Sequence, residues 1–278
     1  MTGMMTLTAF ADEISEDLEE QLDVLLEEDI HHLEFRGAWG KNVLRLTDGE
    51  LARAQHSMRE RGIRVSAIGS PIGKILITDE WGPHLREFSR ALEIAQRFDV
   101  SYIRVFSFFI PQAERAAKYR SGVLERMQEL TERAQDAHVV LLHENEKLIY
   151  GDVPLRCLDV LEHCGSPFLR AAFDPANFVQ CEVRSMQEAW PLLSPYVVYA
   201  HIKDALFADG RVVPAGQGDG EVKAFLQALR DRAYSGYLSI EPHLSSGSAF
   251  SGFSGPALFH EAVQALKGLL GEIGEEWC

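Results

Sequence analysis

The chain has 278 residues, of which 46% are hydrophobic and 25% are charged, so it is long enough to bury a large core. Its formal net charge of -15 disfavours non-specific binding to nucleic acid or to anionic membranes, whose phosphates such a surface repels. The sequence contains no Lys/Arg-rich run and no apolar run long enough to span a membrane. We therefore expect neither a nucleic-acid partner nor a membrane partner.

The cysteines and the N-terminal residues bear on the cellular compartment. None of the four cysteines forms a CxxC pair, and Cys157 and Cys164 are spaced for core packing on a predicted helix. Their spacing indicates no disulfide framework, which favours a reducing compartment. The first residues lack the basic and apolar regions of a secretory signal. We expect a cytoplasmic protein.

The first half of the chain alternates between short apolar runs and amphipathic runs. The short runs have the length and flanking turn residues of buried strands, which predicts strands at 7–11, 32–36, 64–69 and 102–106. Apolar residues at helical spacing predict a helix that Ser15 or Asp17 caps and that ends near 28, followed by helices at about 47–61, 80–98 and 113–137. Thr47-Asp48-Gly49-Glu50 has the form of a capping box.

The second half repeats this alternation, but each strand closes with a polar residue. Four apolar runs, at 139–145, 169–175, 197–204 and 237–243, carry in turn Glu144, Asp174, His201 and Glu241. Helices are predicted between and after them at about 153–164, 185–193, 221–232 and 256–270. One acidic residue or His at the end of a strand is common. Four in succession indicate one site assembled from neighbouring strand ends.

Eight strands that alternate strictly with eight helices require a parallel sheet with helical crossovers. Eight such units in 278 residues fit a closed (β/α)₈ TIM barrel better than an open doubly wound sheet. The first strand is followed by Ala11-Asp12-Glu13 rather than by a GxGxxG turn, which disfavours a Rossmann fold. Because no linker or low-complexity segment divides the sequence, we expect one α/β barrel domain over residues 1–278.

A barrel would bring the four polar strand ends to one mouth, where the active sites of such barrels lie. Glu144, Asp174, His201 and Glu241 supply three carboxylates and one imidazole, an oxygen-rich ligand set. This set favours Mn²⁺ or Mg²⁺, with Co²⁺, Fe²⁺ or Zn²⁺ as alternatives. Without a cation, the carboxylates would repel one another and raise each other's pKa values. The sequence therefore predicts a divalent metal site.

The same residues predict a type of reaction. Four protein ligands in an octahedral site leave two positions, which a carbonyl oxygen and an adjacent hydroxyl of a substrate can fill. The metal would polarise the carbonyl and stabilise an enediolate. Glu144 and Glu241 come from strands three apart, so they can flank the substrate and act as its acid/base pair. This chemistry isomerises or epimerises a small ketose without an organic cofactor.

Five motifs accompany the strand ends: His143-Glu144-Asn145, Phe173-Asp174-Pro175-Ala176-Asn177, His201-Ile202-Lys203-Asp204, Gly216-Gln217-Gly218 and Ile240-Glu241-Pro242. Together they resemble the sugar phosphate isomerase/epimerase group of xylose isomerase-like TIM barrels, over nearly the whole chain. The resemblance implies that the metal is bound by Glu144, Asp174, His201 and Glu241. It also implies a small sugar or sugar phosphate as substrate, with Glu144 and Glu241 as catalytic residues, and it makes a homodimer or homotetramer the expected assembly.

Four other polar residues are candidates for substrate contact: Glu34, Lys203, Asn177 and His243. Some ketose epimerases of the resembled group have a His three residues after the Asp, where this chain has Asn177, and this departure bears on the choice of sugar. Lys203 has the alternative of pairing with a neighbouring carboxylate. Glu34 and Arg36 have the alternative of a structural ion pair, and His243 that of a loop residue above the site.

Two glycine-containing loops could hold an anion, although each has a plainer interpretation. Lys74 could reach a phosphate or carboxylate, but a solvated loop lysine is the favoured reading. Residues Gly216 to Gly220 precede a predicted helix, whose N-terminus could hold a phosphate. Their spacing is not that of a P-loop, so an ordinary tight turn is favoured.

Three other functions compete with an isomerase. The nearest is a metal-dependent dehydratase or lyase of the inosose dehydratase type, in which the same two glutamates eliminate water. A phosphodiesterase resembling the apurinic endonucleases, which share the barrel, would need more His ligands and a basic DNA-binding surface, against the net charge of -15. A non-catalytic ligand-binding barrel is disfavoured by the acid/base pair. We expect a sugar isomerase or epimerase first and a lyase second.

Overall fold

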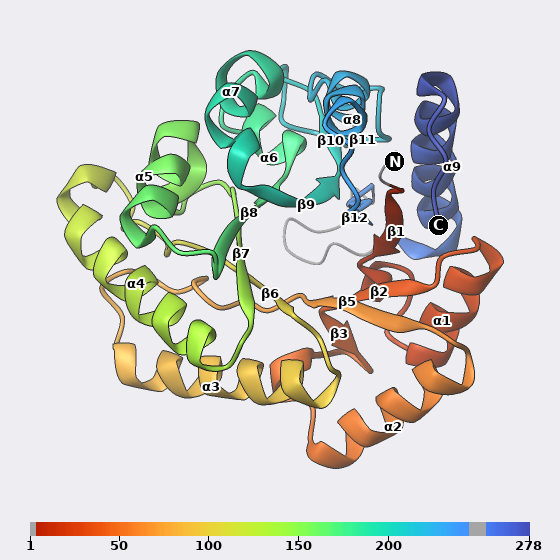
Figure 1. Ribbon diagram of the computed structural model, residues 1–278, viewed down its shortest axis with the longest axis horizontal. Helices are drawn as coiled ribbons and strands as arrows, with labels where there is room; N and C mark the ends of the chain where they lie inside the picture. The colour runs from red at the N-terminus through yellow and green to blue at the C-terminus, as the bar shows by residue number, and fades with distance from the viewer. Residues whose placement is uncertain (1–3, 245–253) are drawn as a thin grey trace.

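The computed structural model describes residues 4–244 and 254–278 and contains a barrel of eight parallel strands (Figure 1). These strands are β1 (Thr6–Ala9), β2 (His32–Phe35), β5 (Arg64–Ile68), β6 (Tyr102–Val105), β7 (Val140–Glu144), β8 (Leu169–Phe173), β9 (Val197–Ile202) and β12 (Tyr237–Ile240). Neighbours in sequence are neighbours in the sheet, and β12 pairs with β1. β1 also lies in contact with β2, so the barrel is nearly closed and the predicted TIM barrel is confirmed.

Helices surround the strands and cover their outer faces (Figure 1). They are α1 (Leu18–Glu27), α2 (Asp48–Glu60), α3 (Trp81–Arg97), α4 (Arg120–Asp136), α5 (Pro154–Cys164), α7 (Trp190–Leu193), α8 (Val222–Asp231) and α9 (Gly255–Ile273). Asp17 caps α1, and the capping box predicted at Thr47 opens α2, with the Glu50 side chain accepting from the Thr47 backbone. A π-helix over Ser185–Ala189 leads into α7.

The structure adds short elements that the sequence patterns do not predict. A five-residue helix, α6 (Pro175–Val179), follows β8 directly, and two antiparallel hairpins, β3–β4 (Gly37–Ala38 with Lys41–Asn42) and β10–β11 (Asp204–Ala205 with Val212–Val213), extend from the barrel mouth. The strand predicted at 237–243 ends earlier, at Ile240, because its ladder partner β1 ends at Ala9 opposite it. Glu241 therefore leaves the sheet at the mouth.

The barrel interior contains buried polar side chains that hydrogen-bond to one another. Thr8 Oγ1 lies 2.7 Å from Ser66 Oγ, which lies 2.9 Å from the Tyr199 hydroxyl. The tyrosine packs against Ala172 of the neighbouring strand β8 and Leu142 of β7. Buried polar groups are tolerated when they find partners inside the protein, and this polar layer forms the floor beneath the strand ends.

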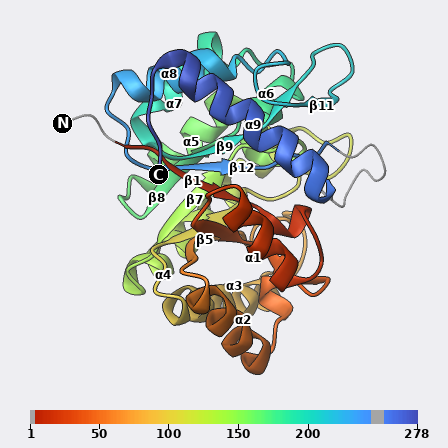
Figure 2. The same ribbon diagram turned by 90° about the vertical axis from the view of Figure 1, so that its right-hand side faces the viewer.

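The two ends of the described chain meet at the barrel. The Leu7 amide donates to the Cys278 carbonyl at 2.8 Å, and the Cys278 amide donates to the Met5 carbonyl at 3.1 Å. α9 packs beside α1, as Figure 2 shows, and the Lys267 side chain donates to the carbonyl of Glu28 at 2.6 Å. Among the helices in the part of the chain that the structure describes, none is both long and apolar enough to cross a membrane.

Candidate metal centre

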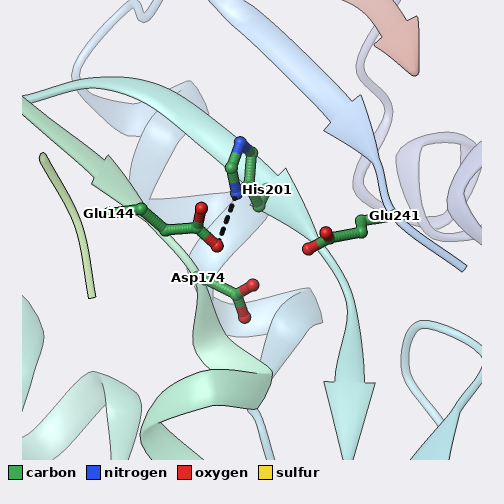
Figure 3. A group of neighbouring side chains, drawn as sticks. All are labelled: Glu144, Asp174, His201 and Glu241. Carbon is green, nitrogen blue, oxygen red and sulfur yellow. Dashed lines mark ion pairs between the residues drawn. The ribbon is translucent and has the colours of Figure 1, made fainter. Parts of the chain in front are cut away.

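The four polar strand ends of the second half converge at the barrel mouth. Glu144 is the last residue of β7, Asp174 follows β8, His201 lies near the end of β9, and Glu241 follows β12. All four are buried, and each offers one ligand atom that lies within 4.8 Å of those of the others. Figure 3 shows Glu144 and Glu241 pointing toward each other from opposite sides, with His201 and Asp174 between them. The arrangement matches the predicted metal site.

Several of these ligand atoms lack a hydrogen bond. Among residues 4–244 and 254–278, no partner is aligned on Glu144 Oε2, Asp174 Oδ2 or His201 Nδ1, although all three atoms are buried. His201 Nδ1 and Glu144 Oε1 form an ion pair at 3.1 Å (Figure 3). Glu144 Oε2 lies 3.3 Å from Arg104 Nη1 and Asp174 Oδ2 lies 2.8 Å from Lys203 Nζ, so these two atoms also meet an opposite charge without a well-aligned hydrogen bond. Three carboxylates and one imidazole that converge within 4.8 Å are ligand types of a divalent metal, so the donor set fits such an ion.

The charges around the site leave a deficit of positive charge. Six carboxyl groups meet there, from Asp12, Glu13, Glu34, Glu144, Asp174 and Glu241. Only three permanently charged cations contact them in the described part of the chain: Arg36, Arg104 and Lys203. Carboxylates in such a group disfavour one another's ionisation. Two groups reduce this excess at neutral pH: Glu13, whose pKa burial raises to about 8, and His201, for which burial opposes protonation but Glu144 and Glu34 raise the pKa. A divalent cation would offset the negative charge that remains.

The pKa values of the proposed ligands reflect this crowding. Burial opposes ionisation of Glu144, but His201 and Arg104 outweigh it and lower the pKa of Glu144 to about 2. Burial raises the pKa of Asp174 to about 6, even though Lys203 acts against it. Burial also opposes the charge of Glu241, whose pKa is nevertheless held well below its usual value, chiefly by Lys203. Both glutamates are therefore anionic at neutral pH and can accept protons.

Glu34 lies behind the site rather than in the cavity. The sequence predicts a substrate contact or an ion pair with Arg36, but Glu34 is fully buried and meets neither expectation. Its Oε2 lies 3.2 Å from His201 Nε2 and accepts from Ser239 Oγ at 2.7 Å. A carboxylate on the outer nitrogen of a metal-binding histidine fixes the orientation and tautomer of the ring. Glu34 thus leaves Nδ1 of His201 to face the other proposed ligands.

Asn177 holds two of the proposed ligands in place from α6. Its backbone amide donates to Asp174 Oδ1 at 2.9 Å, which makes Asp174 the N-cap of this short helix. Its side-chain amide donates to Glu144 Oε1 at 3.1 Å. Asn145 also donates to the Asp174 carbonyl at 2.9 Å. Asn177 borders the cavity as well, so a substrate contact stays a prediction.

Lys203 and His243 both border the cavity, as expected for the remaining predicted substrate residues. Lys203 Nζ lies 2.8 Å from both Asp174 Oδ2 and Glu241 Oε2, so it pairs with carboxylates, the alternative open at the sequence level. His243 Nδ1 lies 3.1 Å from Glu13 Oε1. Burial lowers the pKa of His243 to about 3 and raises that of Glu13 to about 8.

Sequence reasoning missed the charged group on the wall opposite Glu144. Arg36 donates to Asp12 Oδ2 at 2.8 Å, to Glu241 Oε1 at 3.2 Å and to Glu13 Oε1 at 3.3 Å. Asp12 and Glu13 follow β1, so the first strand supplies acidic groups to the same mouth. The signal in the sequence is Ala11-Asp12-Glu13, a fourth acidic strand end besides those of Glu144, Asp174 and Glu241.

Arg104 is a second residue that the sequence analysis passed over. It lies in β6 with 5% of its surface exposed, and Nη1 is 3.3 Å from Glu144 Oε2. It borders a cavity of about 940 Å³, which is lined by two of the proposed ligands, Glu144 and Glu241, and also by Asp12, Arg36, Lys74, Lys147, Lys203 and His243. A charged residue inside an apolar strand was the signal for it.

The glycine loop that follows β10–β11 binds an anion supplied by the chain itself. Both carboxylate oxygens of Asp204 accept backbone hydrogen bonds, from Gly216 at 2.9 Å, Gly218 at 3.0 Å and Gly220 at 2.8 Å. A Cβ at Gly218 would lie 2.4 Å from Asp204 Oδ1, so the close approach requires glycine there. The favoured reading of a tight turn therefore holds, and the phosphate alternative is unnecessary.

Comparison with solved structures finds the same barrel fold in several proteins. A D-tagatose 3-epimerase-like protein superposes with a TM-score of 0.79 at 16% identity, over 97% of this chain and 98% of its own. The probable 3-DHS dehydratase AsbF from Bacillus anthracis gives 0.75 at 15% identity, over 95% and 99%. A xylose isomerase-like TIM barrel protein from Mycobacterium smegmatis, in complex with magnesium, gives 0.69 at 15%, over 97% and 98%.

At these identities the likeness establishes the fold, and comparison with curated protein sequences gives no match. The family assignment comes from the sequence itself. Residues 23–269, which include all eight strands except β1, match the model of one protein family. The chain belongs to the family of xylose isomerase-like TIM barrels, the superfamily that the strand-end motifs resemble.

Proposed function

We propose that the protein is a divalent-metal-dependent isomerase or epimerase of a small ketose or sugar phosphate. The observation that carries the proposal is the placement of two anionic glutamates, Glu144 and Glu241, on opposite sides of one buried ligand group (Figure 3). A substrate between them would present opposite faces to two carboxylates, which is the requirement for removing a proton on one side and returning it on the other. The similarity to an epimerase-like protein in fold supports the same reading.

The metal would be held by Glu144, Asp174, His201 and Glu241, whose oxygen-rich and buried ligand atoms suit Mn²⁺ or Mg²⁺. A bound divalent cation supplies a Lewis acid that draws electrons toward a substrate carbonyl and makes the neighbouring C–H more acidic. One carboxylate oxygen of Glu144 or Glu241 would take that proton. Lys203 Nζ, between Asp174 and Glu241, would keep both of these carboxylates ionised and positioned.

Exchange of substrate hydrogen with solvent tests the proposal. The metal-loaded protein is incubated in D₂O with a panel of ketoses and ketose phosphates, and deuterium next to the carbonyl is followed by NMR. We expect exchange, with or without net isomerisation, for at least one of them. If metal binds but no ketose in the panel exchanges, the isomerase reading gives way to that of a binding protein.

Changes at the two glutamates test their roles. Glu144→Gln and Glu241→Gln each remove the proton acceptor and keep the shape of the side chain, so each is expected to lower turnover by at least about a thousandfold. Glu16→Gln is the control, because Glu16 is an exposed carboxylate at the rim of the same cavity. Normal turnover by either variant would remove that residue from proton transfer.

A dehydratase is the second candidate, favoured by the likeness in fold to the probable 3-DHS dehydratase. The same two glutamates would remove a proton next to the carbonyl and protonate a leaving hydroxyl on the next carbon. Product analysis separates the two reactions. Loss of water, seen as a new ultraviolet-absorbing enone, would replace the isomerase with a lyase.

Phosphodiester hydrolysis with several metal ions finds less support. A second group of potential ligands, Glu13, Glu241 and His243, does lie beside the first. The Arg36 guanidinium already pairs with two of its carboxylates, at 3.3 Å to Glu13 and 3.2 Å to Glu241. A positive side chain there opposes a second cation. We therefore expect one metal ion per chain and no cleavage of abasic DNA.

A further inference from the structure

Of the three cations deep in the cavity, Arg104 makes the fewest interactions. Arg36 donates to three carboxylates, and Lys203 lies 2.8 Å from two. Among the described residues, Arg104 donates one hydrogen bond, to the Gly69 carbonyl at 3.5 Å. It also forms one ion pair, with Glu144 at 3.3 Å. Its Nε has no hydrogen-bond partner among the residues described. Unpaired donors on a buried guanidinium are costly unless a ligand uses them.

Aromatic rings fix the orientation of this guanidinium. The Cζ atom of Arg104 lies 4.7 Å from the centre of the Phe10 ring and 5.0 Å from that of Phe106, and both rings are fully buried. Contacts of this kind hold the guanidinium in place and leave its edge for hydrogen bonding. A planar guanidinium held in this way is preorganised for two parallel hydrogen bonds to a carboxylate.

The wall around Arg104 is the less acidic side of the cavity. Lys74 and Lys147 also line it, from the loops that follow β5 and β7. Lys74 pairs with Glu146 at 3.1 Å, while Lys147 donates to a neutral partner, the Gln180 side chain, at 3.1 Å. The opposite wall, after β1 and β12, holds the acidic group around Arg36. An anionic group of a ligand would therefore be drawn toward Arg104.

We propose that Arg104 is a specificity-determining residue that binds a carboxylate carried by the substrate. This rests on the proposed function, because Glu144, the contact of Arg104, is then a metal ligand and a proton acceptor beside the reacting carbon. The substrate class is narrowed to polyhydroxy ketones that also bear a carboxylate. A phosphate dianion would need a second cation with free donors at this depth, whereas Arg36 and Lys203 each pair with two or more carboxylates.

Three six-carbon polyols test the proposal: gluconate, which carries a carboxylate at one end, glucitol, which is uncharged, and glucitol 6-phosphate, which carries a phosphate at the other end. Each is titrated calorimetrically into the magnesium-loaded full chain. We expect gluconate to bind at least about tenfold more tightly than glucitol, which is the effect of a charge-assisted pair of hydrogen bonds. If glucitol 6-phosphate binds most tightly and gluconate binds no more tightly than glucitol, the site around Arg104 binds a phosphate and the proposal is overturned.

Variants at Arg104 separate its contribution from that of the metal, which can itself bind a carboxylate. Arg104→Gln is expected to weaken gluconate about tenfold or more and glucitol less than twofold, while Arg104→Lys, which keeps the charge but not the fork, falls between. The matched control is Arg126→Gln, because Arg126 also stacks on two rings, those of Trp81 and Phe108, but lies outside the cavity.

Circular dichroism shows whether each variant folds. The comparison of gluconate with glucitol on the unchanged protein stands even if a variant fails to fold. An unaltered gluconate-to-glucitol ratio in folded Arg104→Gln would refute the role of Arg104. The measurement needs no turnover, so a failure of the proposed isomerisation and a failure of carboxylate binding are seen separately.

Discussion

His201 is positioned by a buried carboxylate that does not reach the cavity. Glu34 lies 3.2 Å from Nε2 of the ring, on the side away from Asp174 and Glu241, and is itself held by Ser239 at 2.7 Å. Partners of this kind raise the basicity of a histidine ligand and prevent rotation of its ring. We therefore propose that Glu34 positions His201 for a metal rather than contacting the substrate.

Replacing this carboxylate is expected to weaken metal binding without removing a ligand. Glu34→Gln keeps the shape of the side chain but loses its charge, so we expect the affinity for Mn²⁺ to fall about 10- to 100-fold. Glu28→Gln is the matched control, since Glu28 also contacts a histidine, His260, on α9 far from the mouth. Titration with Mn²⁺ followed by calorimetry measures both. Equal affinities for the two variants would show that Glu34 has only a structural role.

At this scale, sequence reasoning succeeds where a residue's role is local. Glu144 and His201 each close an apolar strand, and that pattern alone places them at the barrel mouth. It fails where partners are far apart in the chain. Glu13 and His243 meet only because the first and last strands are neighbours in the ring, and no short-range pattern encodes that contact. Arg104 was overlooked because a barrel interior is assumed to be apolar.

Among the elements, the loop segment between β9 and α8 is held in place by the side chain of Asp204. Asp204 accepts three backbone hydrogen bonds from the glycine loop and so fixes the chain that follows Lys203. Burial raises the pKa of Asp204, against the amides that lower it. A carboxylate that accepts from several amides supplies the hydrogen-bond acceptors that regular secondary structure would otherwise provide.

Removing that carboxylate is expected to destabilise the fold. Asp204→Ala leaves four backbone amides without their acceptor, those of Ala205 and of the three glycines, and we expect the free energy of unfolding to fall by about 3 kcal/mol in urea denaturation. Asp209→Ala, at an exposed aspartate of the same loop segment, is expected to change it by less than about 0.5 kcal/mol. A similar small change in both variants would mean that the loop does not depend on Asp204.

The elements that the sequence predicts are those with enough residues to show a period. All eight barrel strands and the long helices are of this kind. The two-residue strands of the hairpins and the five residues of α6 are too short for a periodic signal, yet they complete the mouth. The helix predicted from 113 begins only at Arg120, because a 3₁₀ turn over Ala116–Tyr119 precedes it.

For the whole molecule, we expect the free energy of unfolding to fall in acid because of a buried histidine, His32, at the end of the barrel away from the proposed metal site. His32 is 8% exposed, and burial, with Arg64 and His31 adding to it, lowers its pKa from 6.5 to about 4. The folded state thus favours neutral His32. As the pH falls from 6.5 toward 4, the unfolded state binds a proton at this histidine before the folded state does. The free energy of unfolding therefore falls over this range, by up to about 3 kcal/mol.

His32→Gln tests this dependence. Between pH 7 and pH 4.5, the variant is expected to lose about 2 kcal/mol less unfolding free energy than the unchanged protein, as measured by urea denaturation at each pH. His31→Gln changes the half-exposed neighbouring histidine, the weakest of the three causes of the lowered pKa of His32, and is expected to keep most of the original dependence. Parallel curves for His32→Gln and the unchanged protein would contradict the assignment. The carboxylates at the barrel mouth titrate in the variants and in the unchanged protein alike, so their effect cancels in the comparison.

The metal site is the claim on which the account depends most. Its most direct test is calorimetric titration of Mn²⁺ into the chelator-treated full chain, with Asp174→Asn as the ligand variant and Asp209→Asn as the exposed control. The account predicts saturable binding of one ion per chain, lost or strongly weakened in Asp174→Asn and unchanged in Asp209→Asn. Absence of saturable binding, or equal binding by both variants, would contradict it.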